Sequence, residues 1–262
     1  LVYGAGYGRS LKTVFFLAEL LEQRVVEGCP VVILGNEKAK EMAGNIAMVQ
    51  DGLIIIRKES LRFFLWDQIQ ELRSSCRSSL KFALHSYGLL TEEKLDQERF
   101  KSKLDCIVEE ELNFYIYHEV GEILQTSFDT VTLQTIIGRF PGLLIEFLCR
   151  AVKDILADCH PQGLLSYIIR EKRASSLGFY VGFLDGLREQ LFPEMSGAWQ
   201  LFLDNREWDY VEQARNACWE KNLLMANTIK NICQQIGTVP DDQLLNRFKQ
   251  EITVPLGLEP PK

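Results

Sequence analysis

Hydrophobic positions follow two different periods along the chain, and the change comes at about residue 60. Before that point two apolar runs rich in β-branched residues, 30–36 (PVVILGN) and 52–58 (GLIIIRK), predict buried strands. Residues 11–28 and 37–50 carry a pattern typical of helices. The order strand, helix, strand predicts a small parallel crossover. Because two strands are too few for a stable sheet, we expect them to pack against helices or to pair with a strand that precedes residue 1.

From residue 60 onward the apolar period is that of an α-helix. Gly88 is suited to end the first helix, and Thr91 followed by acidic residues is typical of a cap that opens a short one. Pro141 is expected in the first turn of a later helix. Besides the short helix after Thr91, the predicted helices span residues 60–87, 100–125, 130–138, 141–158, 164–191, 194–204 and 206–236.

These patterns predict a mainly α fold, a helical bundle with a small N-terminal α/β portion of two strands. Three regions are expected. Residues 1–98 form the N-terminal α/β and helix region, residues 99–236 form the helical bundle domain, and residues 237–262, rich in proline at their end, form a mostly extended tail. No internal repeat of roughly 20–50 residues is visible.

Composition narrows the class of protein. Of the 262 residues, 47% are hydrophobic and 25% are charged, as in an ordinary soluble globular protein. A net charge of −7 argues against a broad nucleic-acid-binding surface, and no apolar run is long enough to predict a membrane span. The seven cysteines are odd in number and form no CxxC pair, so we expect free thiols and a cytoplasmic protein rather than a disulfide framework.

The sharpest polar pattern lies in the stretch NFYIYHEVGEIL. At about 100° per residue, a helix places Glu111, Tyr115, His118 and Glu122 on one narrow stripe, with Glu119 further round. Imidazole and carboxylate groups one turn apart can converge on a cation. The zinc-protease motif, however, needs histidine where Glu122 stands, and no Glu-x-x-His pair of the di-iron type occurs.

Two interpretations of this stripe stay open. In the first it is a solvated or ion-paired face, because Leu112 and Ile116 belong to a coherent apolar side that lies broadly opposite. In the second it is a divalent metal site, with His118 and Glu122 as ligands and Glu119 as a further ligand or catalytic general base.

The helix that carries IEFLCRAVKDILADCH could complete such a site. Glu146, Arg150, Asp154 and Asp158 form one row with a spacing of four residues, and His160 follows the helix end. An ion pair within the helix accounts for Glu146 and Arg150. Asp154, Asp158 and His160 are therefore the further candidates for metal ligands.

Glycines suggest two other features. GAGYGRS resembles a phosphate loop, but Gly4 and Gly8 are separated by three residues and Arg9 follows, so neither the Walker motif nor the dinucleotide fingerprint is matched and no nucleotide binding is expected. In the helix predicted over 164–191, Ala174 and the glycines at 178, 182 and 186 recur at every fourth position. That stripe predicts a close packing seam within the chain, with a homodimer seam as the alternative.

Four stretches of the chain resemble a largely helical family of bacterial proteins with no established activity. They are YIYHEVGE, FLCRAVKDILAD, LLSYIIREKRASSLGFYVGFLDGL and VVILGNEKAKEMAGN. The resemblance covers most of the chain and implies no reaction. The predicted function is therefore limited to a metal site on a helix, and the alternative is a non-enzymatic interaction or scaffold protein whose acidic stripe is structural.

Overall fold

The fold is described from a computed structural model that defines residues 1–7, 13–41, 45–70 and 78–258. The chain forms two compact units. The first combines Leu1–Ile123 with Pro161–Phe183, and the second combines Leu124–His160 with Leu184–Lys262. Within the defined residues, no helix has both the length and the apolar character needed to cross a bilayer.

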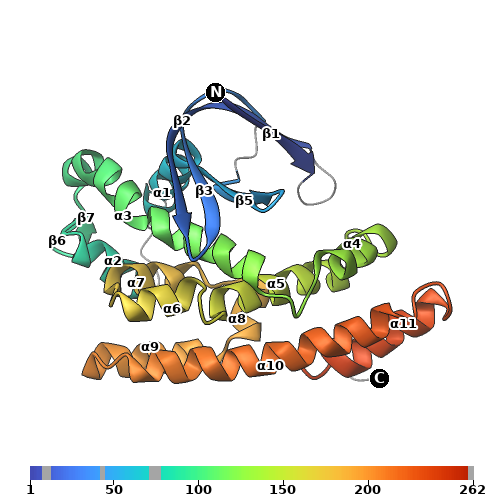
Figure 1. Ribbon diagram of the computed structural model, residues 1–262. Helices are drawn as coiled ribbons and strands as arrows, with labels where there is room; N and C mark the ends of the chain where they lie inside the picture. Colours follow the sequence, from blue (N-terminus) through green and yellow to red (C-terminus); the bar gives the residue numbers. More distant parts are fainter. Residues whose placement is uncertain (8–12, 42–44, 71–77, 259–262) are drawn as a thin grey trace. The chain divides into compact units, whose positions relative to one another are not determined.

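The first unit contains a curled sheet of mixed direction (Figure 1). Its strands are β1 (Val2–Tyr7), β2 (Thr13–Val26), β3 (Cys29–Lys40), β4 (Ala47–Gln50) and β5 (Leu53–Arg57). They are ordered β1-β2-β3-β5-β4; β3 and β5 run parallel, as predicted, and the other neighbours are antiparallel. The parallel strands are joined through the strand β4 and not through the predicted helix.

The predicted fold class, a helical bundle with only two strands, is therefore wrong. The segment 11–28 was expected to be helical, yet its described part is almost all strand β2. Phe16 and Ala18 are fully buried while Phe15 is exposed, which is the two-residue alternation of a strand with one face on the core. The hairpin to β3 turns at Glu27 and Gly28, both with positive φ, as a two-residue turn of the twisted type requires.

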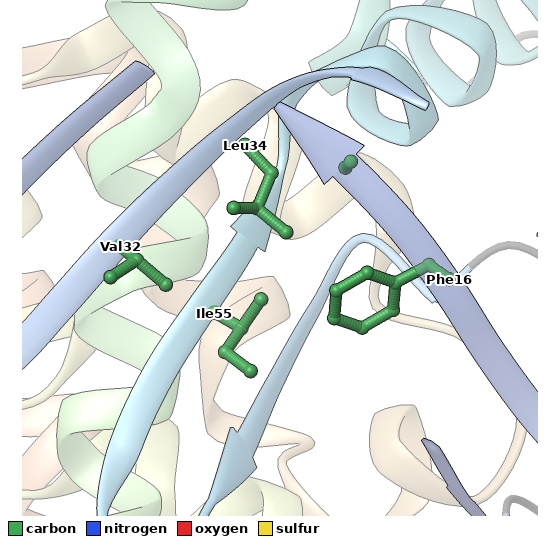
Figure 2. Packing of buried hydrophobic residues seen from close by; sticks show 5 residues of the cluster. Phe16, Val32, Leu34 and Ile55 are labelled. Carbon is green, nitrogen blue, oxygen red and sulfur yellow. The ribbon is translucent and has the colours of Figure 1, made fainter. Parts of the chain in front are cut away.

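The sheet curls because the pairing of β2 with β3 is irregular. Its register shifts at three places between Leu17 and Glu22, and such bulges increase local twist and bend a strand. The two edge strands approach one another: a Cβ at Gly4 of β1 would lie 3.2 Å from the amide oxygen of Gln50 in β4. Figure 2 shows the ring of Phe16 directed into the interior of this curled sheet, where it packs against other core side chains. The labelled core residues are Phe16, Val32, Leu34 and Ile55.

Helices complete the first unit. They are α1 (Lys58–Gln70), α2 (Ser78–Ser86), α3 (Gln97–Leu124), α6 (Leu164–Arg170) and α7 (Ala174–Phe183). The predicted single helix over 60–87 is present at both ends, and residues 71–77 lie outside the described part of the chain. Gly88 ends α2 as predicted, with a φ of 64° and a bond from the Leu89 amide to the Leu84 carbonyl.

Thr91 does not open a helix. It belongs to a short hairpin in which β6 (Leu90–Thr91) pairs with β7 (Lys94–Leu95). Glu92 and Glu93 both have positive φ, so the acidic residues that resembled a helix start form a tight turn.

The long helix predicted over 164–191 is interrupted twice, which gives α6, α7 and α8 (Gly186–Leu191). Lys172 and Gly186 have φ values of 50° and 52°, outside the helical region. Gly186 therefore does not continue the small-residue stripe.

Two glycines of the stripe do form a close seam inside the first unit, where α7 packs against α2. A Cβ at Gly178 would lie 2.9 Å from the backbone oxygen of Ser79 and 3.1 Å from the Cβ of Ala83. A Cβ at Gly182 would collide with the side chain of Leu80. The predicted seam within the chain is confirmed at these two positions.

The second unit is helical in its described part, apart from an isolated β-bridge between Ile236 and Val239. Its elements are α4 (Thr130–Arg139), α5 (Leu144–Cys159), α8, α9 (Glu194–Asn205), α10 (Asp209–Cys233), α11 (Asp241–Phe248) and the π-helical turn η2 (Lys249–Thr253). The helix α10 packs against α5 and α9. The extended tail predicted for 237–262 is wrong, because α11 and η2 occupy much of it; residues 259–262 lie outside the described part.

Candidate functional site

The His-Glu pair lies near the C-terminal end of α3, a helix buried on several sides. Its core-facing residues include Ile116 and Val120, both fully buried. His118 and Glu122 stand one turn apart, with side chains 23% and 20% exposed. The distance from Nε2 of His118 to Oε1 of Glu122 is 3.9 Å. The predicted pair therefore faces one direction and is reachable from solvent.

Glu119 and Glu111, the other carboxylates considered on α3, are buried. Glu111 accepts hydrogen bonds from the Tyr87 hydroxyl at 2.6 Å and the Ser176 hydroxyl at 2.8 Å. Burial raises the pKa of Glu111, although both hydroxyl donors and the nearby Arg173 favour its charged form. Glu111 thus links α3 to the end of α2 and to α7, which is a structural role.

The remaining predicted ligands lie on α5 and at its end, in the second unit. Asp154 is half-buried. Asp158 is fully buried, and Nη2 of Arg188 donates a hydrogen bond to its carboxylate at 3.0 Å. His160 packs its ring edge-to-face on Trp219, with the ring centres 5.5 Å apart. Asp158 is therefore already neutralised inside its own unit.

Burial, followed by the positive charge of Arg215, lowers the pKa of His160. Its imidazole is thus kept neutral at physiological pH, the form that can ligate a metal. On the same helix the predicted ion pair is confirmed: Nη2 of Arg150 lies 2.9 Å from Oε1 of Glu146. Glu146 also accepts a hydrogen bond from the Gly142 amide at 2.7 Å, so its carboxylate caps the N-terminal end of α5.

A buried charge cluster in the sheet was missed by the sequence interpretation. Arg57, at the end of β5, is fully buried and contacts Glu37 at 2.5 Å and Glu41 at 2.9 Å. Burial by itself would raise the pKa of Glu41, but the bonds from Arg57 and from the Phe15 amide lower it overall. The only signal in the sequence is that an arginine directly follows the apolar run LIII. Nζ of Lys40 lies 3.2 Å from Oε2 of Glu37, so two cations face the two carboxylates, and the cluster ties β5 to the end of β3.

The glycine-rich start does not supply a phosphate loop within the described residues. Gly4 and Gly6 are part of strand β1, and Gly8, Arg9 and Ser10 lie outside the described part of the chain.

Comparison with known proteins gives a family and no activity. Residues 1–57 match the N-terminal domain, and residues 62–251 the C-terminal domain, of a family of unknown function, DUF6866. No curated protein and no solved structure matches the chain. These findings agree with the resemblance to a family without established activity. The two matches together cover most of the chain, which therefore belongs to the DUF6866 family.

Proposed function

We propose that the protein binds a divalent transition-metal ion through His118 and Glu122. The observation that supports this is the 3.9 Å between the imidazole Nε2 and the carboxylate Oε1, both on one accessible face of α3. Metal bonds of about 2.0–2.2 Å at a tetrahedral angle place two ligand atoms roughly 3.4 Å apart. A small side-chain rotation would therefore bring this pair to coordinating distance.

The other predicted residues keep narrower proposed roles. Glu119 is the neighbour of His118 and stays the proposed general base or further ligand. Asp154 and His160 belong to the second unit, and their part in metal binding stays a prediction from the sequence. Asp158 is the weakest candidate, because a metal would have to displace the guanidinium of Arg188 from a fully buried carboxylate.

Histidine signals give a direct test, since the chain has three histidines. We expect zinc or cobalt to shift the ring resonances of His118 and to leave those of His85, on α2, unchanged. His118→Ala and Glu122→Gln should each weaken zinc binding at least tenfold, since loss of even a residue that only orients a metal ligand typically costs about 10–100-fold. His85→Ala is the matched control. Equal zinc affinity in all four proteins would exclude this site. Asp154→Asn and His160→Ala then show whether either residue contributes.

A second candidate is a non-enzymatic interaction protein, in which the acidic residues are structural. It is favoured by the large apolar side chains exposed on β1 and β2, where Tyr3 is 65%, Leu21 55% and Val25 70% exposed. This candidate includes the proposed homodimer. It predicts that the molecular mass measured by light scattering doubles with rising concentration, while added zinc leaves the histidine signals unchanged.

We also propose a reducing, cytoplasmic location. The six cysteines in the described part are free, and four of them are buried. Thiol titration of the protein unfolded without reductant should find no disulfide.

A further inference from the structure

The second unit contains a cavity of about 280 Å³ that none of the residues discussed as metal ligands lines. One wall is the start of α5 and the other is formed by α11 and the π-helical turn η2. The apolar lining residues are Leu143, Leu144, Ile145, Leu245 and Phe248; the polar ones are Asn246, Lys249 and Thr253.

The lining of this cavity is mostly apolar and carries a single positive charge. Five of its side chains are aliphatic or aromatic, and its one charged residue is Lys249, so no carboxylate lines the cavity. The nearest acidic residue in sequence on the α5 wall, Glu146, turns its carboxylate to the Gly142 amide and to Arg150. A negative charge inside the cavity would therefore meet a lysine, while the carboxylate nearest along that wall is already neutralised.

The backbone around the cavity also favours a negatively charged ligand. Leu143, at the N-terminal boundary of α5, gives no side-chain cap, and Leu144 and Ile145 in the first turn both line the cavity. First-turn amides point out of a helix and favour an anion. Opposite them, η2 is a single π-helical turn, an arrangement that costs regular hydrogen bonding and is frequently found at functional sites.

We infer that this cavity binds a small aliphatic monocarboxylate, with its carboxylate at Lys249 and its tail against Leu144 and Phe248. The size sets the class of ligand: 280 Å³ lies just below the range of about 300–1,000 Å³ usual for ligand pockets. A dinucleotide coenzyme is too large for this volume, and a chain of roughly six to eight carbons is suitable. One cation and an apolar lining select a single negative charge over a phosphate ester or a sugar.

Calorimetric titration of the full chain with octanoate tests this inference. We expect saturable one-to-one binding, with acetate and octan-1-ol at least tenfold weaker because each lacks one half of the complementarity. Lys249→Met, which keeps the aliphatic stem and removes the charge, should weaken octanoate binding about tenfold or more. Lys153→Met is the matched control, since Lys153 is on α5 but does not line the cavity.

A second variant tests the cavity independently of the charge on Lys249. Leu144→Trp should fill the cavity and abolish octanoate binding while thermal unfolding stays cooperative. If Leu144→Trp fails to fold, the comparison of Lys249→Met with Lys153→Met tests the inference by itself. The inference is overturned by the absence of saturable octanoate binding, or by equal affinity in Lys249→Met and Lys153→Met.

Discussion

Buried charges at single residues make the sharpest predictions about stability. Glu111 is almost fully buried, and burial raises its pKa above the ordinary value of 4.5. The folded protein therefore holds this proton more tightly than the unfolded chain does. Its contribution to stability is fully present below pH 4.5 and is lost as the pH rises through the folded-state pKa.

Glu111→Gln should remove this dependence, because the amide is neutral at every pH and can still hydrogen-bond Tyr87 and Ser176. We expect the free energy of unfolding of the variant, relative to the parent, to rise between pH 4.5 and pH 8. Glu98→Gln, at the exposed start of α3, is the control for the loss of one carboxylate from the same helix. Urea unfolding at several pH values measures this pH dependence. A parent and variant whose difference does not change with pH would contradict a raised pKa.

Arg57 gives the opposite case, a buried cation that bridges two carboxylates. Arg57→Met should cost about 3–5 kcal/mol, because the buried carboxylates of Glu37 and Glu41 would lose the cation that bridges them, and Glu41 would keep only the Phe15 amide. The triple variant with Glu37→Gln and Glu41→Gln should recover part of that loss. Chemical denaturation of the three proteins compares them. If the triple variant is no more stable than Arg57→Met, the carboxylates are not the cause of the loss.

At the scale of secondary-structure elements, the seam between α2 and α7 can be tested with glycine replacements. Gly178→Ala gains helix propensity of about 0.8–1 kcal/mol but forces a methyl group against the Ser79 carbonyl oxygen, at 2.9 Å. Overpacking typically costs about 1–3 kcal/mol, so we expect a net loss of stability. Gly182→Leu should be destabilising for the same reason, against Leu80.

Gly197→Ala is the matched control for the seam. Gly197 lies inside α9, and a Cβ there would meet nothing within 4 Å, so this change should raise the melting temperature. Differential scanning calorimetry distinguishes the signs. A Gly178→Ala protein as stable as the parent would show that the two helices do not pack closely in solution.

Elements differed in how well they could be predicted from sequence, for physical reasons. The helices α3, α4, α5, α9 and α10 have long apolar periods or clear caps, such as Asp129, whose side chain accepts the Thr132 amide before α4. Strand β2 was missed because its bulges break strict alternation and its sequence FFLAELLEQ contains good helix formers. Breaks at Lys172 and Gly186 depend on positive φ values, which no local period predicts.

At the scale of the whole molecule, contacts between residues one helical turn apart could be predicted from the sequence, and contacts between distant segments could not. The pairing of His118 with Glu122 follows from helix geometry alone, and it could be predicted. The buried partners of Glu111 could not, because Tyr87, Ser176 and Arg173 are far from it in sequence. The same holds for Asp158, whose partner Arg188 comes from another helix. The predicted domain boundaries at residues 98 and 236 stay a prediction.

The metal content of the purified protein tests the central proposal most directly. The protein should be prepared without chelating resin or chelator, dialysed, and measured by elemental analysis beside His118→Ala and the control His85→Ala. We predict close to one equivalent of a divalent transition metal in the parent and in His85→Ala, and a loss of most of it in His118→Ala with the fold retained by circular dichroism. A parent protein that contains no metal, and takes up none after incubation with zinc, manganese or cobalt, would contradict the proposal.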